Sequence, residues 1–252
     1  MTRNRLIAIS LVVAVAIGGY LAWDQVLRGD DVAPLALPST SPAPVATEPI
    51  ATAAASTDPG TEAGSTPASA SGVAGTWTVV EGSEAGYRVR EQLANLPAET
   101  DAVGRTPDVS GTMTLEASGD GARLTSGEIT VDTTTIASDE GRRDDRMRTE
   151  GLETDAYPTA TFVVTTPVDI PASALEGSPA DVTLTGDLTL HGVTKSVEIP
   201  AEAQLVDGQV QVAGSLTFAL ADFDIVAPNV GGFIISIADE GALEFLLVFG
   251  RA

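Results

Sequence analysis

Residues 182–200 read VTLTGDLTLHGVTKSVEIP, and this stretch decides the fold. Apolar residues at positions 182, 184, 188 and 190 alternate with threonine and aspartate, a period of two that predicts a strand with one apolar and one polar face. His191 and Gly192 interrupt the alternation, which resumes at Lys195. We therefore predict two strands joined by a short turn, in an antiparallel sheet with one face in water.

The same alternation recurs along the rest of the chain from Gly75 onward. Further runs with strand character lie at residues 76–80, 86–89, 109–117, 124–134, 160–166, 209–220, 233–238 and 242–249. The connections between them are rich in Gly, Pro and Asp. Such a succession of strands predicts an all-β domain at residues 75–252, an antiparallel sheet closed or nearly closed into a barrel. Residues 139–152 are the one stretch of this domain that resembles a helix.

The N-terminal segment has the pattern of a membrane anchor. Residues 6–23 form an 18-residue run without a charge, just long enough to span a bilayer as a helix, and Arg3 and Arg5 precede it. Since basic flanks stay in the cytoplasm, residues 1–28 are predicted to be a single-pass anchor with the barrel extracytoplasmic. A cleaved signal peptide is the alternative, although the run ends in Tyr20–Trp23, which suits a signal peptidase poorly.

Residues 29–74 differ in composition from both flanking segments. They are dominated by Ala, Thr, Pro and Ser and have no periodic apolar face. A segment of this kind cannot bury enough surface to offset its chain entropy. We therefore predict a disordered linker between the anchor and the barrel.

The overall composition excludes several classes of function. The chain has 252 residues and a net charge of -22, so phosphate backbones repel it and we expect no nucleic-acid partner. It contains no Cys, which removes disulfides, thiol catalysis and zinc–thiolate sites. A single His also argues against a His-based metal site, so we expect no metal and no resident cofactor.

Four arginines stand close together in residues 139–152, at positions 142, 143, 146 and 148. One interpretation is an anion site at the mouth of the barrel, because guanidinium groups pair well with phosphate. The other is local pairing on a helix, where Asp139 lies four residues before Arg143 and Asp144 four before Arg148. The sequence leaves both open.

Residues suited to catalysis are few. His191 has no recognisable Ser or Cys partner, and pairs of acids such as Asp222 and Asp224 arise by chance in so acidic a chain. We expect no enzymatic activity, and a hydrolase built on these residues is the weakest of the hypotheses.

Three stretches resemble the YceI-like domain family: TWTVVEGSEAGYRVRE (76–91), TVDTTTIASDEGRRDDRMRTEGLETDAYPTATFVVTT (130–166) and GDLTLHGVTKSVEIP (186–200). The last is close to the family's Leu-Thr-x-His-Gly-Val-Thr-Lys signature. The resemblance implies a lipocalin-like barrel that holds a polyisoprenoid chain in its lumen. The chain departs from the family at Arg146-Met147-Arg148, where His-Leu-Arg is common, and at Glu91, where many members carry His.

The resemblance leads to a functional hypothesis: a membrane-tethered, extracytoplasmic, non-catalytic binding protein for an isoprenoid lipid, either a quinone or a polyprenyl phosphate. The expected lining of the lumen is Tyr87, Val89, Phe162, Val164, Leu184, Leu188, Leu190, Leu216, Phe218, Phe233, Ile235, Phe245 and Leu247. A headgroup at the mouth would meet Arg143, Arg146 or His191.

The alternative hypothesis is a ligand-free acidic module displayed on a stalk, for protein interaction or envelope stress. It predicts a filled lumen. The aromatic residues in the strands fit a packed core as well as a lipid lining.

Overall fold

The computed structural model of the protein describes residues 32–38, 70–93, 99–227 and 234–252. The predicted anchor, residues 6–23, and most of the predicted linker lie outside these ranges. Within them, no helix is both long enough and apolar enough to cross a bilayer.

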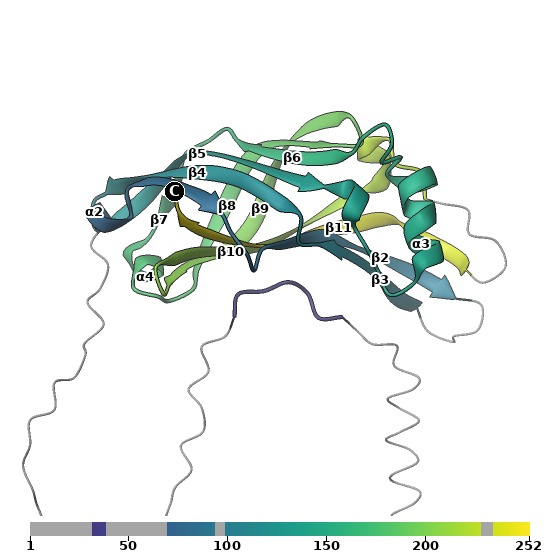
Figure 1. Ribbon diagram of the computed structural model, residues 1–252, viewed down its shortest axis with the longest axis horizontal. Coiled ribbons are helices and arrows are strands. Elements are labelled where there is room, and N and C mark those ends of the chain that lie inside the picture. The colour runs from purple at the N-terminus through teal and green to yellow at the C-terminus, as the bar shows by residue number, and fades with distance from the viewer. Residues whose placement is uncertain (1–31, 39–69, 94–98, 228–233) are drawn as a thin grey trace, which may run out of the picture.

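The described chain is dominated by antiparallel strands (Figure 1). The strands are β1 (Gly75–Val79), β2 (Glu84–Leu93), β3 (Glu99–Thr106), β4 (Val109–Ser118), β5 (Gly121–Asp132), β6 (Thr159–Val164), β7 (Val168–Ile170), β8 (Ala180–Leu190), β9 (Val193–Val206), β10 (Gln209–Ala219) and β11 (Ile234–Arg251). Short helical segments join them: α2 (Ala70–Val73), η1 (Thr133–Thr135), α3 (Gly141–Arg146), η2 (Met147–Gly151), α4 (Ala172–Leu175) and η3 (Leu220–Phe223).

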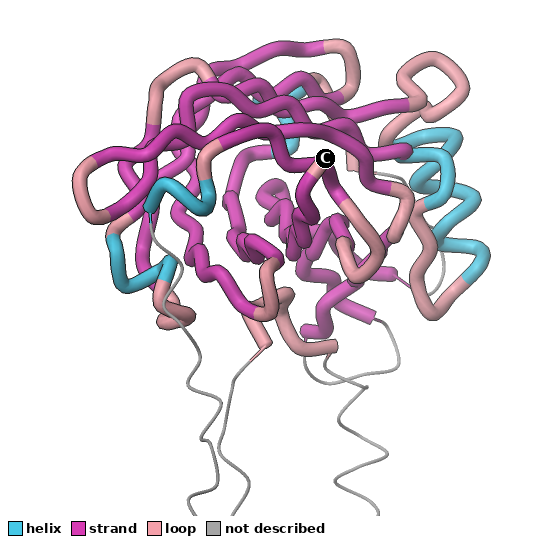
Figure 2. The backbone as a smooth tube through the Cα atoms, turned by 60° about the vertical axis from the view of Figure 1, so that its left-hand side comes forward, coloured by secondary structure: helices cyan, strands magenta, loops and turns pink. Residues whose placement is uncertain are grey.

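Eight of the strands close into a barrel, in the order β1-β4-β5-β6-β8-β9-β10-β11 and back to β1. Figure 2 shows these strands wrapping around a common centre, with the helical segments at the periphery. Strand β11 is long enough to pair with two strands along one edge: Phe249 lies opposite Val79 of β1, and Leu243 lies opposite Tyr87 of β2. Strand β3 extends the sheet beyond β2. The predicted all-β antiparallel barrel is confirmed.

The hairpin predicted from residues 182–200 is strands β8 and β9. Its turn consists of His191 and Gly192, whose φ angles of 51° and 74° are both left-handed. That conformation matches the right-handed twist of the two strands. Three details were not predicted: β3 and β7 were missed, and residues 234–238 and 242–249 belong to one strand, β11, with irregular pairing to β2 between them.

Two short parts of the predicted disordered linker are placed against the barrel. Residues 70–73 form α2, where Val73 is 1% exposed and packs in the core beside Trp77. Residues 32–38 lie on the outside of the sheet, and Leu37 is 8% exposed. For these two stretches the prediction of disorder was wrong, because each contains an apolar side chain that the barrel surface buries.

Candidate functional site

The barrel encloses an apolar cavity of about 160 Å³. The cavity lies between two packed core clusters: Met113 and Leu247 line it from the first, and Leu188 and Leu220 from the second. Its walls come from β2, β4, β5, β6, β8, β9, β10 and β11, together with Met147 of η2. Because most of the side chains that line the cavity are aliphatic or aromatic, the interior is suited to a hydrocarbon ligand.

Eleven of the predicted lining residues do line this cavity: Tyr87, Val89, Phe162, Val164, Leu184, Leu188, Leu190, Leu216, Phe218, Phe245 and Leu247. Phe233 lies outside the described residues, and Ile235 belongs to β11 but its side chain is not described. On each of these strands, the alternation that directs one predicted lining residue inward directs the other predicted lining residues inward as well.

The structure adds lining residues that the sequence did not single out. Ile129 and Val131 share the inward face of β5 through its alternation, and Leu124 reaches the same face because the pairing of β5 with β4 shifts register between Leu124 and Ser126. Met147 and Leu152 reach the cavity from the helical segment after β5. No periodicity in the sequence indicated that this segment covers the barrel.

Tyr87 brings a polar atom to one end of the cavity. Its ring packs so closely on Gly104 that a Cβ at that position would lie 2.5 Å from Tyr87 Cε1. The side chain is 8% exposed, and its hydroxyl finds no hydrogen-bond partner among the described residues. Burial disfavours the phenolate and raises the pKa of Tyr87 to about 12.

Beside Tyr87, a buried ion pair joins β2 to α3. Arg143 Nη2 donates to Glu91 Oε1 at 2.8 Å, and Arg143 also pairs with Asp139. Burial opposes the charge of Arg143, but the carboxylates of Glu91 and Asp139 raise its guanidinium pKa above the ordinary value. Arg143 Nε is buried and has no partner among the described residues.

A second, smaller cavity of about 40 Å³ adjoins the first at this end. Tyr87, Val89 and Met147 line both cavities, and the smaller one adds Glu91, Arg143 and Arg146. Two of the three expected headgroup residues, Arg143 and Arg146, are therefore at the polar end. Glu91 was not expected there, because an inward-facing acid runs against the apolar pattern of β2.

The local pairing expected around the arginines is partly right. The pair of Asp139 and Arg143 is present. Asp144 does not pair with Arg148 as expected; it accepts hydrogen bonds from the Ser138 amide at 2.9 Å and the Ser138 hydroxyl at 2.6 Å. Arg148 instead lies 3.6 Å from Asp145. The sequence therefore predicted one of the local ion pairs on the helix but did not indicate Glu91, the long-range partner of Arg143.

His191 lines neither cavity. Its Nδ1 atom lies 3.0 Å from the carbonyl oxygen of Phe223, and its Nε2 atom lies 3.1 Å from Glu153 Oε2. The Tyr157 ring packs edge-on against the imidazole at 4.6 Å. These contacts fix the β8–β9 turn to η3, so His191 is held on the turn and away from the polar end of the cavity.

Among the described residues, no three His, Asp or Glu side chains gather closely enough to hold a metal ion.

The chain is thus an antiparallel barrel with an apolar cavity and one polar end, an architecture with room for one small ligand. It belongs to the YceI-like domain family, whose model matches residues 77–249.

Curated relatives agree with this assignment. The chain is 32% identical over 133 residues to a UPF0312 protein of Shewanella denitrificans, covering 49% of this chain and 63% of the relative. It is 36% identical over 113 residues to a UPF0312 protein of Vibrio parahaemolyticus, covering 42% of this chain and 56% of the relative. The match thus spans less than two thirds of these relatives.

A solved structure shares the fold. It is a polyisoprenoid binding domain from Saccharophagus degradans implicated in plant cell wall breakdown, with a TM-score of 0.54 and 18% identity. The similarity covers 71% of this chain and 99% of that domain.

Proposed function

We propose that this protein binds an isoprenoid lipid inside the barrel and releases it chemically unchanged. The observation that carries the proposal is the interior cavity, whose walls are built from apolar side chains of eight strands. The family assignment and the polyisoprenoid binding of the Saccharophagus degradans domain support the same ligand class.

The tail of such a lipid gains affinity from burial alone. Each methylene taken from water is worth about 0.8 kcal/mol, so a prenyl chain needs few polar contacts. The alternative of a ligand-free interaction module predicts a filled lumen, and the cavity between the two core clusters favours a ligand over that alternative.

The polar end of the cavity favours a neutral headgroup. Tyr87 and Arg143 each bring a buried donor without a partner, the hydroxyl and Nε. The positive charge of Arg143 is already balanced by Glu91 and Asp139. A quinone carbonyl, which accepts hydrogen bonds and carries no charge, fits donors of this kind better than a phosphate, whose charge would meet two carboxylates. We therefore place a quinone ahead of a polyprenyl phosphate.

In this proposal the protein is anchored in a membrane. Residues 6–23 serve as a single-pass anchor with the barrel on the extracytoplasmic side, as the uncharged run after Arg3 and Arg5 indicates. This arrangement places the barrel beside the bilayer in which isoprenoid lipids dissolve.

Native mass spectrometry of the full-length chain, purified in detergent from its own cell envelope, tests the proposal. We expect a mass excess that organic extraction removes and that is identified as an isoprenoid quinone. A bare polypeptide mass that stays bare after incubation with quinones and with polyprenyl phosphates would refute lipid binding and favour the interaction module.

Two valines of β6 provide a matched pair of variants for the same measurement. Val164 lines the cavity, whereas its neighbour Val163 faces outward and is 41% exposed. Val164→Trp should fill the cavity and lose the bound lipid, and Val163→Trp should keep it. Equal lipid content in the two variants would place the ligand outside the cavity.

A further inference from the structure

A short segment of the linker lies across the outside of the barrel. It consists of residues 32–38, Val-Ala-Pro-Leu-Ala-Leu-Pro, and is called the strap below. Figure 1 shows it in purple along the outer side of the sheet, with β10 and β11 above it. It forms neither helix nor strand, and Leu37 is buried, with 8% of its surface exposed.

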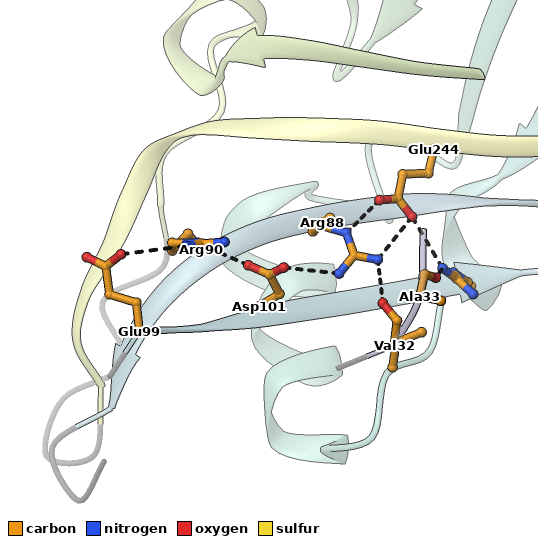
Figure 3. A network of polar contacts seen from close by, with 8 residues as sticks. Val32, Ala33, Arg88, Arg90, Glu99, Asp101 and Glu244 are labelled. Atoms are coloured by element: carbon orange, nitrogen blue, oxygen red, sulfur yellow. Dashed lines mark hydrogen bonds and ion pairs between the residues drawn. The ribbon is translucent and has the colours of Figure 1, made fainter. Parts of the chain in front are cut away.

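The first half of the strap is held by arginines of β2 and β3 (Figure 3). Arg88 Nη2 donates to the Val32 carbonyl oxygen at 2.7 Å, and Arg105 Nη2 donates to the Ala33 carbonyl oxygen. Both arginines also bind Glu244 of β11, at 2.5 Å from Arg88 Nε and 3.3 Å from Arg105 Nη2. Each of these Nη2 nitrogens therefore donates both to a strap carbonyl and to Glu244 Oε2.

Glu244 is a buried acid within this cluster. It points outward, because Leu243 and Phe245 on either side of it line the cavity, yet its side chain is only 4% exposed. A carboxylate withdrawn from water requires charged partners, which Arg88 and Arg105 supply. The strap covers this cluster with backbone carbonyl groups, which carry no net charge and therefore leave the charges of Glu244 and the two arginines balanced.

The second half of the strap forms one wall of an open surface groove, and β8, β9 and β10 form the other walls. Leu35 and Ala36 line this groove of about 500 Å³ together with residues 181–183, 200–202 and 213–215. Ala213, on the outward face of β10, is only 5% exposed. The strap thus crosses the sheet from β3 to β8. Pro34 and Pro38 have no N–H group, so crossing the sheet without strand pairing leaves fewer donors unsatisfied.

We propose that the strap is a docking motif for the outer face of the barrel and that it latches the tether. When it is docked, residue 32 is held on the barrel, so the chain between residue 32 and residue 69 does not lengthen the tether. When it is released, the chain from residue 32 to residue 69 is added to the tether, and a flexible chain of that length spans about 35 Å on average. Docking or release of the strap therefore sets the distance between the barrel and the structure that holds the N-terminal segment. This proposal does not depend on the identity of the lipid or on lipid binding.

Crosslinking in the full-length chain in detergent tests the docking. The chain has no Cys, so paired cysteines react only where they are introduced. Ala36 and Ser215 line the same groove. At low protein concentration, we expect A36C/S215C to react with a short bis-maleimide at least tenfold faster than the control pair A46C/S215C. Ala46 is nearer to the barrel along the chain, so a freely moving linker would crosslink it at least as fast, and equal rates would overturn the proposal.

Two charge substitutions in the strap then identify the contact that holds it. Leu37 is buried and Pro34 is exposed, so the same added carboxylate meets different surroundings. In the A36C/S215C background, Leu37→Asp should slow crosslinking to the rate of the A46C control pair, and Pro34→Asp should change it less than threefold. An unchanged rate in Leu37→Asp would overturn the docking of the strap through its apolar side chain. The unfolding midpoint of each variant shows that the barrel itself is intact.

Discussion

Arg143 and Glu91 form the ion pair that closes the polar end of the cavity. Arg143 Nη2 lies 2.8 Å from Glu91 Oε1, and the Glu91 side chain is 3% exposed. Glu91 comes from the inward face of β2 and Arg143 from α3, so the pair holds the helix across that end of the barrel. The pair also decides the electrostatics of the site, because it presents an arginine whose charge is already balanced.

Removing that balance should change which headgroup the protein prefers. In Glu91→Gln the side chain keeps its size and an acceptor oxygen, but Arg143 loses its nearest inward-facing carboxylate. We expect the affinity for a polyprenyl phosphate, relative to a quinone of equal tail length, to rise about tenfold, which corresponds to about 1.4 kcal/mol. Competition binding with the two lipids measures this ratio.

Glu99→Gln provides the matched control for that experiment. It makes the same change in net charge, but Glu99 lies on the solvent-facing side, is 57% exposed and lies 4.0 Å from Arg90. Its headgroup preference should equal that of the unmodified protein. An unchanged preference in Glu91→Gln would show that charge balance at Arg143 does not select the headgroup.

Tyr87 should make the stability of the barrel depend on alkaline pH. Burial raises its pKa from 10.0 to about 12 in the folded protein, so between these values the folded state keeps a proton that the unfolded chain has lost. The free energy of unfolding is therefore unaffected by Tyr87 below about pH 10 and falls as the pH rises from 10 to 12, by about 2–3 kcal/mol in total. Denaturant unfolding across this pH range measures the fall.

Tyr87→Phe should remove most of that fall. The same variant deletes a buried hydroxyl that has no partner among the described residues, so we expect it to be at least as stable as the unmodified protein at pH 8. Tyr157→Phe, at a tyrosine that is 36% exposed, is the control and should retain the alkaline fall. Retention of the full fall in Tyr87→Phe would assign it to other groups.

The fold and most of the cavity wall could be predicted from the sequence because one physical rule governs both. Alternation of apolar and polar residues sets which side chains of a strand face inward, so the runs around Leu188 and Phe245 indicated the sheet and its lining together. The β8–β9 turn was predicted for a similar reason, since His191-Gly192 interrupts the alternation over only two residues.

The polar end and the strap could not be predicted in the same way. Glu91 and Arg143 are 52 residues apart and come from a strand and a helix, so no local spacing indicates their contact. Strand β3, ETDAVGRT, has weak alternation because its inward positions carry small or polar residues, such as Ala102 opposite Val89 and Gly104 opposite Tyr87. The strap has the composition of a linker, and only the surface that receives it shows that Leu37 is buried.

His191 should matter for stability and not for binding. Its imidazole joins the β8–β9 turn to Phe223 and Glu153, and its backbone is in the left-handed region with a φ of 51°. We expect His191→Ala to lower the free energy of unfolding by about 1–2 kcal/mol and to leave lipid affinity unchanged. His191→Asn, which tolerates this backbone conformation, should lose less. A loss of lipid affinity without a loss of stability would show that His191 takes part in lipid binding.

Two glycines of the barrel, one in β5 and one in β8, should differ in their response to an added methyl group, because one faces the cavity and the other faces packed atoms. At Gly127, which lines the cavity, the nearest atom to a new Cβ is Val164 Cγ2 at 3.2 Å, and Val164 borders free space into which it can turn. At Gly186, a Cβ would lie 2.3 Å from the Val163 carbonyl oxygen and 2.6 Å from Phe162 Cζ.

We therefore expect Gly127→Ala to change the free energy of unfolding by less than about 1 kcal/mol and Gly186→Ala to lower it by about 1–3 kcal/mol or more. Chemical denaturation of the lipid-free protein measures both values. Because Gly127→Ala takes up cavity space, it should also weaken lipid binding while stability is retained. Equal destabilisation in the two variants would mean that the wall at Gly127 is packed as tightly as the wall at Gly186, and the lumen would then have no room for a ligand beside β5.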